Sequence, residues 1–148
     1  MKSILAAVDF SDATGEIVDL ACSIARAYGV TIHLLHAAAP DPAFVGLEAG
    51  PKSVRDQRAR ELRGERHLLA EIAASVQKNG IEAEAHLIEG ATADTIIREA
   101  EKLNAGMIVM GSRGRAPIAK TILGSVSEAV LREATCPVVI LPHLMWSG

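Results

Sequence analysis

The sequence predicts an α/β fold in which an open, five-stranded parallel sheet carries helices on both faces. Short apolar segments alternate with helical ones along the 148 residues, and such strands pair in parallel through right-handed crossovers. The composition, with 49% hydrophobic and only 3% aromatic residues, is typical of buried parallel strands covered by helices. A chain of this length is expected to form one domain over residues 1–148.

Five segments are predicted as strands because they are short and rich in aliphatic residues. They cover residues 4–8, 31–37, 81–88, 107–110 and 137–141. The first is wholly apolar, as expected of a buried strand. The third alternates apolar with polar residues, which indicates an edge strand with one exposed face.

Four helices are predicted from apolar residues that recur at helical spacing. They end at Tyr28, cover about residues 53–78, begin near Thr92, and cover about residues 125–133. Ser11 or Asp12 can cap the first helix and Thr92 the third, because short polar side chains accept hydrogen bonds from free amides at a helix start. The proline- and glycine-rich segment 38–52 is predicted as a loop.

Ligands of such sheets bind beyond the carboxyl ends of the strands, where the strand order switches. Four places in the chain are expected there: Asp9, the segment 36–38, the turn at Gly90 and Ala91, and the loop that begins at Gly111. This rule selects the candidate binding residues without reference to any motif.

The loop after the fourth strand has the pattern of a phosphate-binding loop. It reads Gly111-Ser112-Arg113-Gly114, then nine residues, then Gly124-Ser125-Val126-Ser127. Glycines let backbone amides approach an anion without obstruction by Cβ, and the helix that follows directs the positive end of its dipole to the same place. Hydroxyl groups of Ser125 and Ser127 would add donors there.

Several of these residues have a structural alternative. Ser125 also begins a capping box with Glu128, so its hydroxyl can serve its own helix. Asp9 can cap the first helix or contact a nucleotide, and the sequence leaves both open. Three basic side chains can neutralise phosphate charge or form a solvated rim: Arg113, Arg115 and Lys120.

Composition and missing motifs argue against several functions. The few aromatic residues and the net charge of -3 do not suit a nucleic-acid surface. The chain has neither the GxxxxGK[ST] P-loop nor a GxGxxG pattern after the first strand. No run approaches the ~20 apolar residues of a membrane span, and two cysteines without CxxC spacing suit a reducing cytoplasm. A soluble cytoplasmic protein is expected.

The sequence predicts no catalytic group and no metal site. No Ser-His-Asp or Cys-His set has the context of a nucleophile. The five histidines form no short ligand pair on a helix, and His33 and His36 point to opposite faces of their strand.

The glycine pattern resembles the ATP-binding signature of the universal stress protein family, and the resemblance covers nearly the whole chain. Further matching segments are Val8-Asp9-Phe10-Ser11, Leu35-His36, Glu89-Gly90 and Cys136-Pro137-Val138-Val139-Ile140. The resemblance implies the strand order 3-2-1-4-5 and ATP bound in the crevice, with or without Mg²⁺. It also implies a homodimer that pairs the last strand, Pro137–Leu141, an exposed apolar edge.

The family pattern, carried over residue by residue, assigns a binding role to twelve positions. The phosphates would lie against Gly111, Gly114, Gly124, Ser125 and Ser127, and the cofactor-binding set also includes Ser112, Arg113 and Val126. Asp9 would contact a ribose hydroxyl, the backbone at Ala37 would read the adenine edge, and Gly90 with Ala91 would line the ribose side.

The leading hypothesis is an ATP-binding stress-response or regulatory module, because the chain has a full phosphate loop without an evident catalytic base. One alternative is a slow ATPase or nucleotidyl-transferring enzyme on the same scaffold. Another is a dimeric interaction module that binds no nucleotide.

Overall fold

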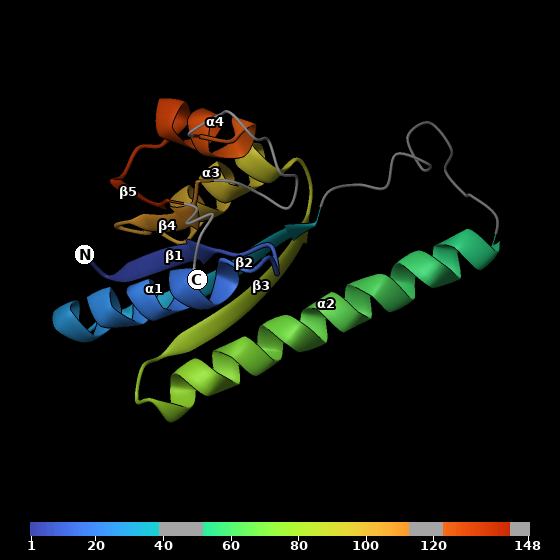
Figure 1. Cartoon of the computed structure of the whole chain (residues 1–148), viewed down its shortest axis with the longest axis horizontal. Coiled ribbons are helices and arrows are strands. Elements are labelled where there is room, and N and C mark those ends of the chain that lie inside the picture. The colour runs from blue at the N-terminus through green and yellow to red at the C-terminus, as the bar shows by residue number, and fades with distance from the viewer. Residues whose placement is uncertain (39–51, 113–122, 143–148) are drawn as a thin grey trace.

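The chain forms an open, five-stranded parallel sheet in a computed structural model that describes residues 1–38, 52–112 and 123–142 (Figure 1). The strands are β1 (Ser3–Ala7), β2 (Thr31–Ala38), β3 (Ala83–Glu89), β4 (Ile108–Gly111) and β5 (Val138–Leu141). The helices are α1 (Thr14–Tyr28), α2 (Lys52–Lys78), α3 (Thr92–Lys102) and α4 (Ser125–Glu133). The strand order is β3-β2-β1-β4-β5, and every strand pair is parallel. The predicted fold class and strand order are therefore confirmed.

The sheet has a helical layer on each face, with α1 and α2 on one side and α3 and α4 on the other (Figure 1). Side chains alternate between the two faces of a strand. Ile4 and Ala6 of β1 therefore pack in the cluster that includes residues of α1 and α2. Leu5, between them, packs with residues of α3 and α4. The core thus consists of two apolar layers separated by the sheet.

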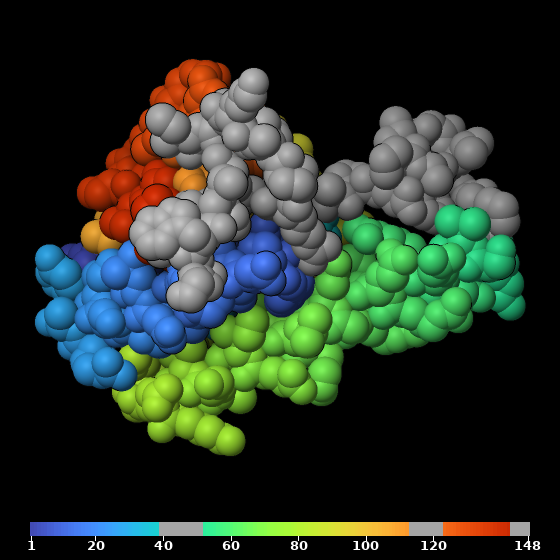
Figure 2. Space-filling view, viewed as in Figure 1, coloured from blue at the N-terminus to red at the C-terminus, as the bar shows by residue number. Residues whose placement is uncertain are grey.

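Helix α2 is longer than the surface on which it packs. Its buried residues, Leu69, Ala73 and Val76, all lie in its second half and follow helical spacing. Its first half extends past the sheet as an arm, drawn in green at the right of Figure 2. The contribution of α2 to the core therefore comes from its second half.

Helix α3 begins at Thr92 itself, and no side-chain hydrogen bond caps its start at Ala91. The prediction that Thr92 caps this helix is therefore wrong. Helix α1 ends at Gly29, whose φ of 64° lies in the left-handed region, which glycine enters without a steric penalty.

No helix in the described part of the chain combines the length and apolar character that crossing a bilayer requires. The predicted loop over residues 38–52 lies outside the described residues except for its two ends, Ala38 in β2 and Lys52 in α2.

Candidate functional site

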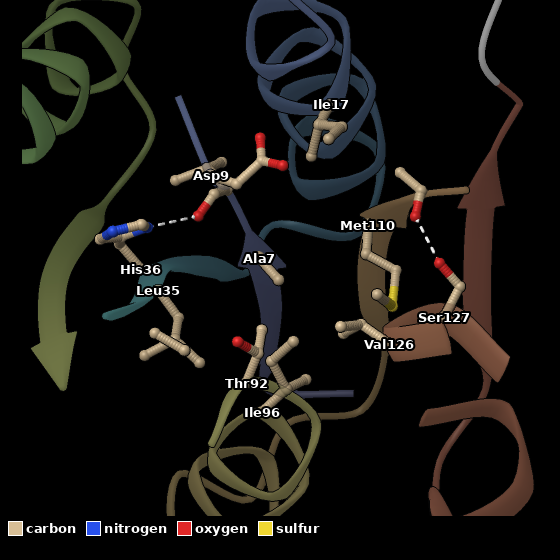
Figure 3. Close-up of a pocket in the computed structure, with 13 residues that line it drawn as sticks. Ala7, Asp9, Ile17, Leu35, His36, Thr92, Ile96, Met110, Val126 and Ser127 are labelled. Carbon is tan, nitrogen blue, oxygen red and sulfur yellow. Dashed lines mark hydrogen bonds between the residues drawn. The ribbon is translucent and has the colours of Figure 1, made fainter. Parts of the chain in front are cut away.

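A cavity of about 280 Å³ lies at the carboxyl ends of β1, β2 and β4 (Figure 3). Strand β1 pairs with β2 on one side and with β4 on the other, so the cavity lies where the strand order switches. This is the position at which parallel α/β sheets bind ligands. The volume is close to the lower end of the range of roughly 300–1,000 Å³ that is usual for small-molecule sites.

Five of the twelve predicted binding residues line this cavity: Asp9, Ala37, Gly111, Val126 and Ser127. Gly90, Ala91, Ser112, Gly124 and Ser125 are described but are not lining residues. Arg113 and Gly114 lie outside the described residues, as do Arg115 and Lys120. The structure therefore brings together residues from three strand ends and one helix start.

Helix α4 presents its first turn to the cavity. It begins at Ser125, and the capping position before it is held by Gly124, whose backbone is extended. The amide of Glu128 donates to the carbonyl oxygen of Gly124 and not to the hydroxyl of Ser125. The capping-box alternative for Ser125 is therefore wrong. The amides of the first three helical residues have no acceptor within the helix, and two of these residues, Val126 and Ser127, line the cavity. The positive end of the helix dipole and these free amides favour an anion at this position.

Ser127 joins the start of α4 to the end of β4. Its side chain is buried, and Oγ lies 2.9 Å from the carbonyl oxygen of Gly111 (Figure 3). The same oxygen lies 3.1 Å from the carbonyl oxygen of Ser112. A hydroxyl group has one proton to donate, and here it is shared between these two acceptors. In this arrangement the hydroxyl donates within the chain, and its predicted contact with a phosphate stays a prediction.

Asp9 follows β1 and stabilises the turn that leads to α1. The backbone amide of Ser11 donates to Oδ1 of Asp9 at 2.9 Å. Helix α1 begins only at Thr14, after Ala13, without a side-chain cap. The alternative in which Asp9 caps this helix is therefore wrong, as is the prediction that Ser11 or Asp12 does so.

His36 positions the backbone at the end of β1. Its Nδ1 lies 2.9 Å from the carbonyl oxygen of Val8, so Nδ1 carries the donating proton, because a carbonyl can only accept. Nε2 lies 3.2 Å from Oε2 of Glu65 on α2. This carboxylate oxygen is buried and forms no hydrogen bond with the described residues.

Phe10 packs against His36, with their ring centroids 4.6 Å apart. Its φ of 61° lies in the left-handed region, which is uncommon for a bulky residue. The chain thus turns sharply immediately after Asp9, at the edge of the cavity.

The apolar floor of the cavity was missed by sequence reasoning. Leu35, Ile96 and Met110 line it, and all three also belong to the core cluster on the α3 side of the sheet. Buried core residues and the walls of an apolar pocket have the same sequence pattern, so no local signal could have separated them.

The chain is similar in sequence to a protein family and to several of its known members. The model of the Universal stress protein family matches residues 1–142. A universal stress protein of Methanocaldococcus jannaschii is 30% identical over 141 residues, which are 95% of this chain and 81% of that protein. Universal stress protein A homolog 1 of Coxiella burnetii is 33% identical over 139 residues, which are 93% and 94% of the two chains.

The fold also matches solved structures. The universal stress protein from Archaeoglobus fulgidus, solved in complex with dAMP, has 25% sequence identity and a TM-score of 0.64. The match covers 95% of this chain and 97% of that one.

Proposed function

The chain belongs to the universal stress protein family, and from this premise we propose that it binds ATP and acts as a nucleotide-dependent stress-response or regulatory module. One observation carries the proposal. The cavity at the switch in strand order unites Asp9, Ala37, Gly111 and the first turn of α4, and open parallel sheets bind nucleotides at this position. The dAMP complex of the A. fulgidus relative supports adenine nucleotides as the ligand class.

The polyphosphate would lie against Gly111 and the start of α4. The amides of Ser125, Val126 and Ser127 would donate to phosphate oxygens, helped by the helix dipole. In this arrangement Ser127 would contribute through its backbone, because its hydroxyl proton is already shared with two carbonyl groups.

The nucleoside would occupy the remainder of the cavity. The carboxylate of Asp9 would accept a hydrogen bond from a ribose hydroxyl, and the backbone at Ala37 would read the adenine edge. Gly90 and Ala91 would line the ribose side. The apolar floor formed by Leu35, Ile96 and Met110 suits the flat face of a base, as is usual for cavities that bind cofactors.

Isothermal titration with ATP, with MgCl₂ or with EDTA, tests this proposal. Binding should release or absorb heat and raise the unfolding temperature, since a ligand at 100 times its Kd stabilises the native state by about 2.7 kcal/mol. Comparing the affinity for GTP with that for ATP shows whether the site prefers adenine. Comparing the affinity for AMP with that for ATP shows whether the β- and γ-phosphates contribute to binding. The absence of both a heat of binding and a shift in unfolding temperature with millimolar ATP would contradict the proposal. Phosphate release measured in the same samples would show whether bound ATP is also hydrolysed.

We also propose that the protein forms a homodimer through Pro137–Leu141. Strand β5 is an edge of the sheet, and its four residues, Val138–Leu141, are only half-buried in the single chain. An apolar edge strand offers unpaired backbone groups to a second copy. Analytical ultracentrifugation should find dimers, and a charged substitution, Val139→Lys, should shift the equilibrium to monomer.

A further inference from the structure

Three side chains with metal-binding atoms converge on one face of the sheet, on the edge strand β3 and its neighbour β2. The register of β2 and β3 places His33 opposite Glu84, and His86 lies two residues further along β3, on the same face. Their ligand atoms all lie within 4.8 Å of one another. Of the residues with assigned positions, these form the one group of three or more histidine, cysteine or acidic side chains close enough for a single ion.

The distances within this group match those between ligands of one tetrahedral ion. Nδ1 of His33 lies 3.0 Å from Nε2 of His86 and 3.3 Å from Oε2 of Glu84. The same Nε2 and Oε2 atoms are 3.7 Å apart. Atoms bound to a tetrahedral zinc at about 2.1 Å stand about 3.4 Å from each other. The three separations bracket that value, so one atom from each side chain can reach a common ion with small side-chain rotations.

The group is also accessible to a cation. Imidazole nitrogens and carboxylate oxygens are both ligands that zinc accepts. Glu84 adds a carboxylate, and its side chain is 62% exposed, so an ion can enter from solvent.

We propose that His33, Glu84 and His86 bind one Zn²⁺ ion. Two imidazole nitrogens and one carboxylate oxygen favour Zn²⁺ over Mg²⁺ or Ca²⁺, which prefer oxygen ligands throughout. Three protein ligands leave the fourth position of the tetrahedron for water. None of the three residues lines the nucleotide cavity, so the proposal is independent of ATP binding. The ion would link the edge strand β3 to β2 and would stabilise the native state.

Calorimetric titration of ZnCl₂ into the protein tests this proposal. The protein should carry no histidine tag, and the buffer should contain no nucleotide or chelator. One ion should bind per chain, and the unfolding temperature should rise and then fall again when EDTA is added. Glu84→Gln removes the ligand charge from an exposed side chain with little risk to the fold, and His86→Ala removes a nitrogen ligand. Each should weaken the affinity for Zn²⁺ roughly tenfold or more, since even the loss of an outer partner of a ligand has effects of 10–100-fold.

A matched control is His67→Ala on α2. Nε2 of His67 lies 3.0 Å from Oε1 of Glu71, and both side chains are exposed, so this pair repeats the chemistry of the site with only two ligands. The variant should bind Zn²⁺ as the wild type does. Loss of binding in His67→Ala, or unchanged binding in both Glu84→Gln and His86→Ala, would overturn the proposal. So would the absence of any heat and thermal shift with Zn²⁺.

A second measurement identifies the ligand atoms. Co²⁺ bound in place of Zn²⁺ should show the visible spectrum of a nitrogen and oxygen ligand set. A strong thiolate charge-transfer band would place the ion at a cysteine and would also overturn the proposal.

Discussion

Oγ of Ser127 donates a hydrogen bond across 2.9 Å to the carbonyl oxygen of Gly111, so the start of α4 is tied to the end of β4. The same hydroxyl lies 3.1 Å from the carbonyl oxygen of Ser112, and the amide of Gly124 donates to that second carbonyl. These contacts hold the first turn of α4 beside Gly111, where both line the cavity. The position of the helix start thus depends on a serine side chain as well as on apolar packing.

Replacing Ser127 with alanine should therefore loosen α4. The change removes a buried hydrogen bond, which we expect to lower the free energy of unfolding by about 1 kcal/mol, and it should also weaken ATP binding. Ser125→Ala is the control for stability, because Ser125 is exposed in the same helical turn. Urea unfolding followed by circular dichroism compares the two. Equal midpoints for both variants would show that the Ser127 bond contributes nothing to stability.

Gly90 and Gly64 should respond in opposite ways to alanine. A Cβ atom at Gly90 would lie 2.6 Å from Oγ1 of Thr95, and Thr95 is fully buried, so we expect Gly90→Ala to destabilise the fold by about 1–3 kcal/mol. A Cβ atom at Gly64 meets nothing within 4 Å. Because Gly64 lies within α2, Gly64→Ala should stabilise by about 0.5–1 kcal/mol. Thermal unfolding measures both, and a stable Gly90→Ala variant would contradict the steric argument.

Two substitutions of Asp9 should separate its turn-forming role from its proposed contact with ribose. Asp9→Asn keeps an oxygen that can accept from the amide of Ser11, so stability should change little, whereas Asp9→Ala should lose about 1 kcal/mol. Both remove the charged acceptor, and ATP affinity should fall roughly tenfold. Titration calorimetry and urea unfolding report the two effects. Wild-type affinity in Asp9→Asn would contradict the ribose contact.

The two cysteines should react slowly in the native protein. Burial raises the pKa of the Cys22 thiol, with a further increase from Asp19 that Arg26 partly opposes, and burial raises the pKa of the Cys136 thiol. Since the thiolate is the nucleophile, a raised pKa leaves less of it at any pH below that pKa. Alkylation by iodoacetamide at pH 8, followed by mass spectrometry, should be slower than for free cysteine and should accelerate in urea. Equal rates in native and unfolded protein would contradict this.

The starts of α1 and α3 show where sequence patterns were insufficient. Polar residues stood at suitable positions, yet Ala13 and Ala91 precede the two helices without side-chain caps. The direction in which the chain leaves a strand decides where the first helical turn can form, and several neighbouring residues satisfy the local preference equally.

The alternation of strands and helices was readable from the chain because hydrophobic periodicity follows from the geometry of each element. The group proposed to bind Zn²⁺ could not be read from the chain, since His33 and His86 are 53 residues apart and meet through the register of β2 and β3. The hydrogen bond of Ser127 likewise joins residues 16 apart. Such contacts form only when whole helices and strands pack together. That packing depends on many small interactions between distant residues, so no short segment of the sequence predicts it.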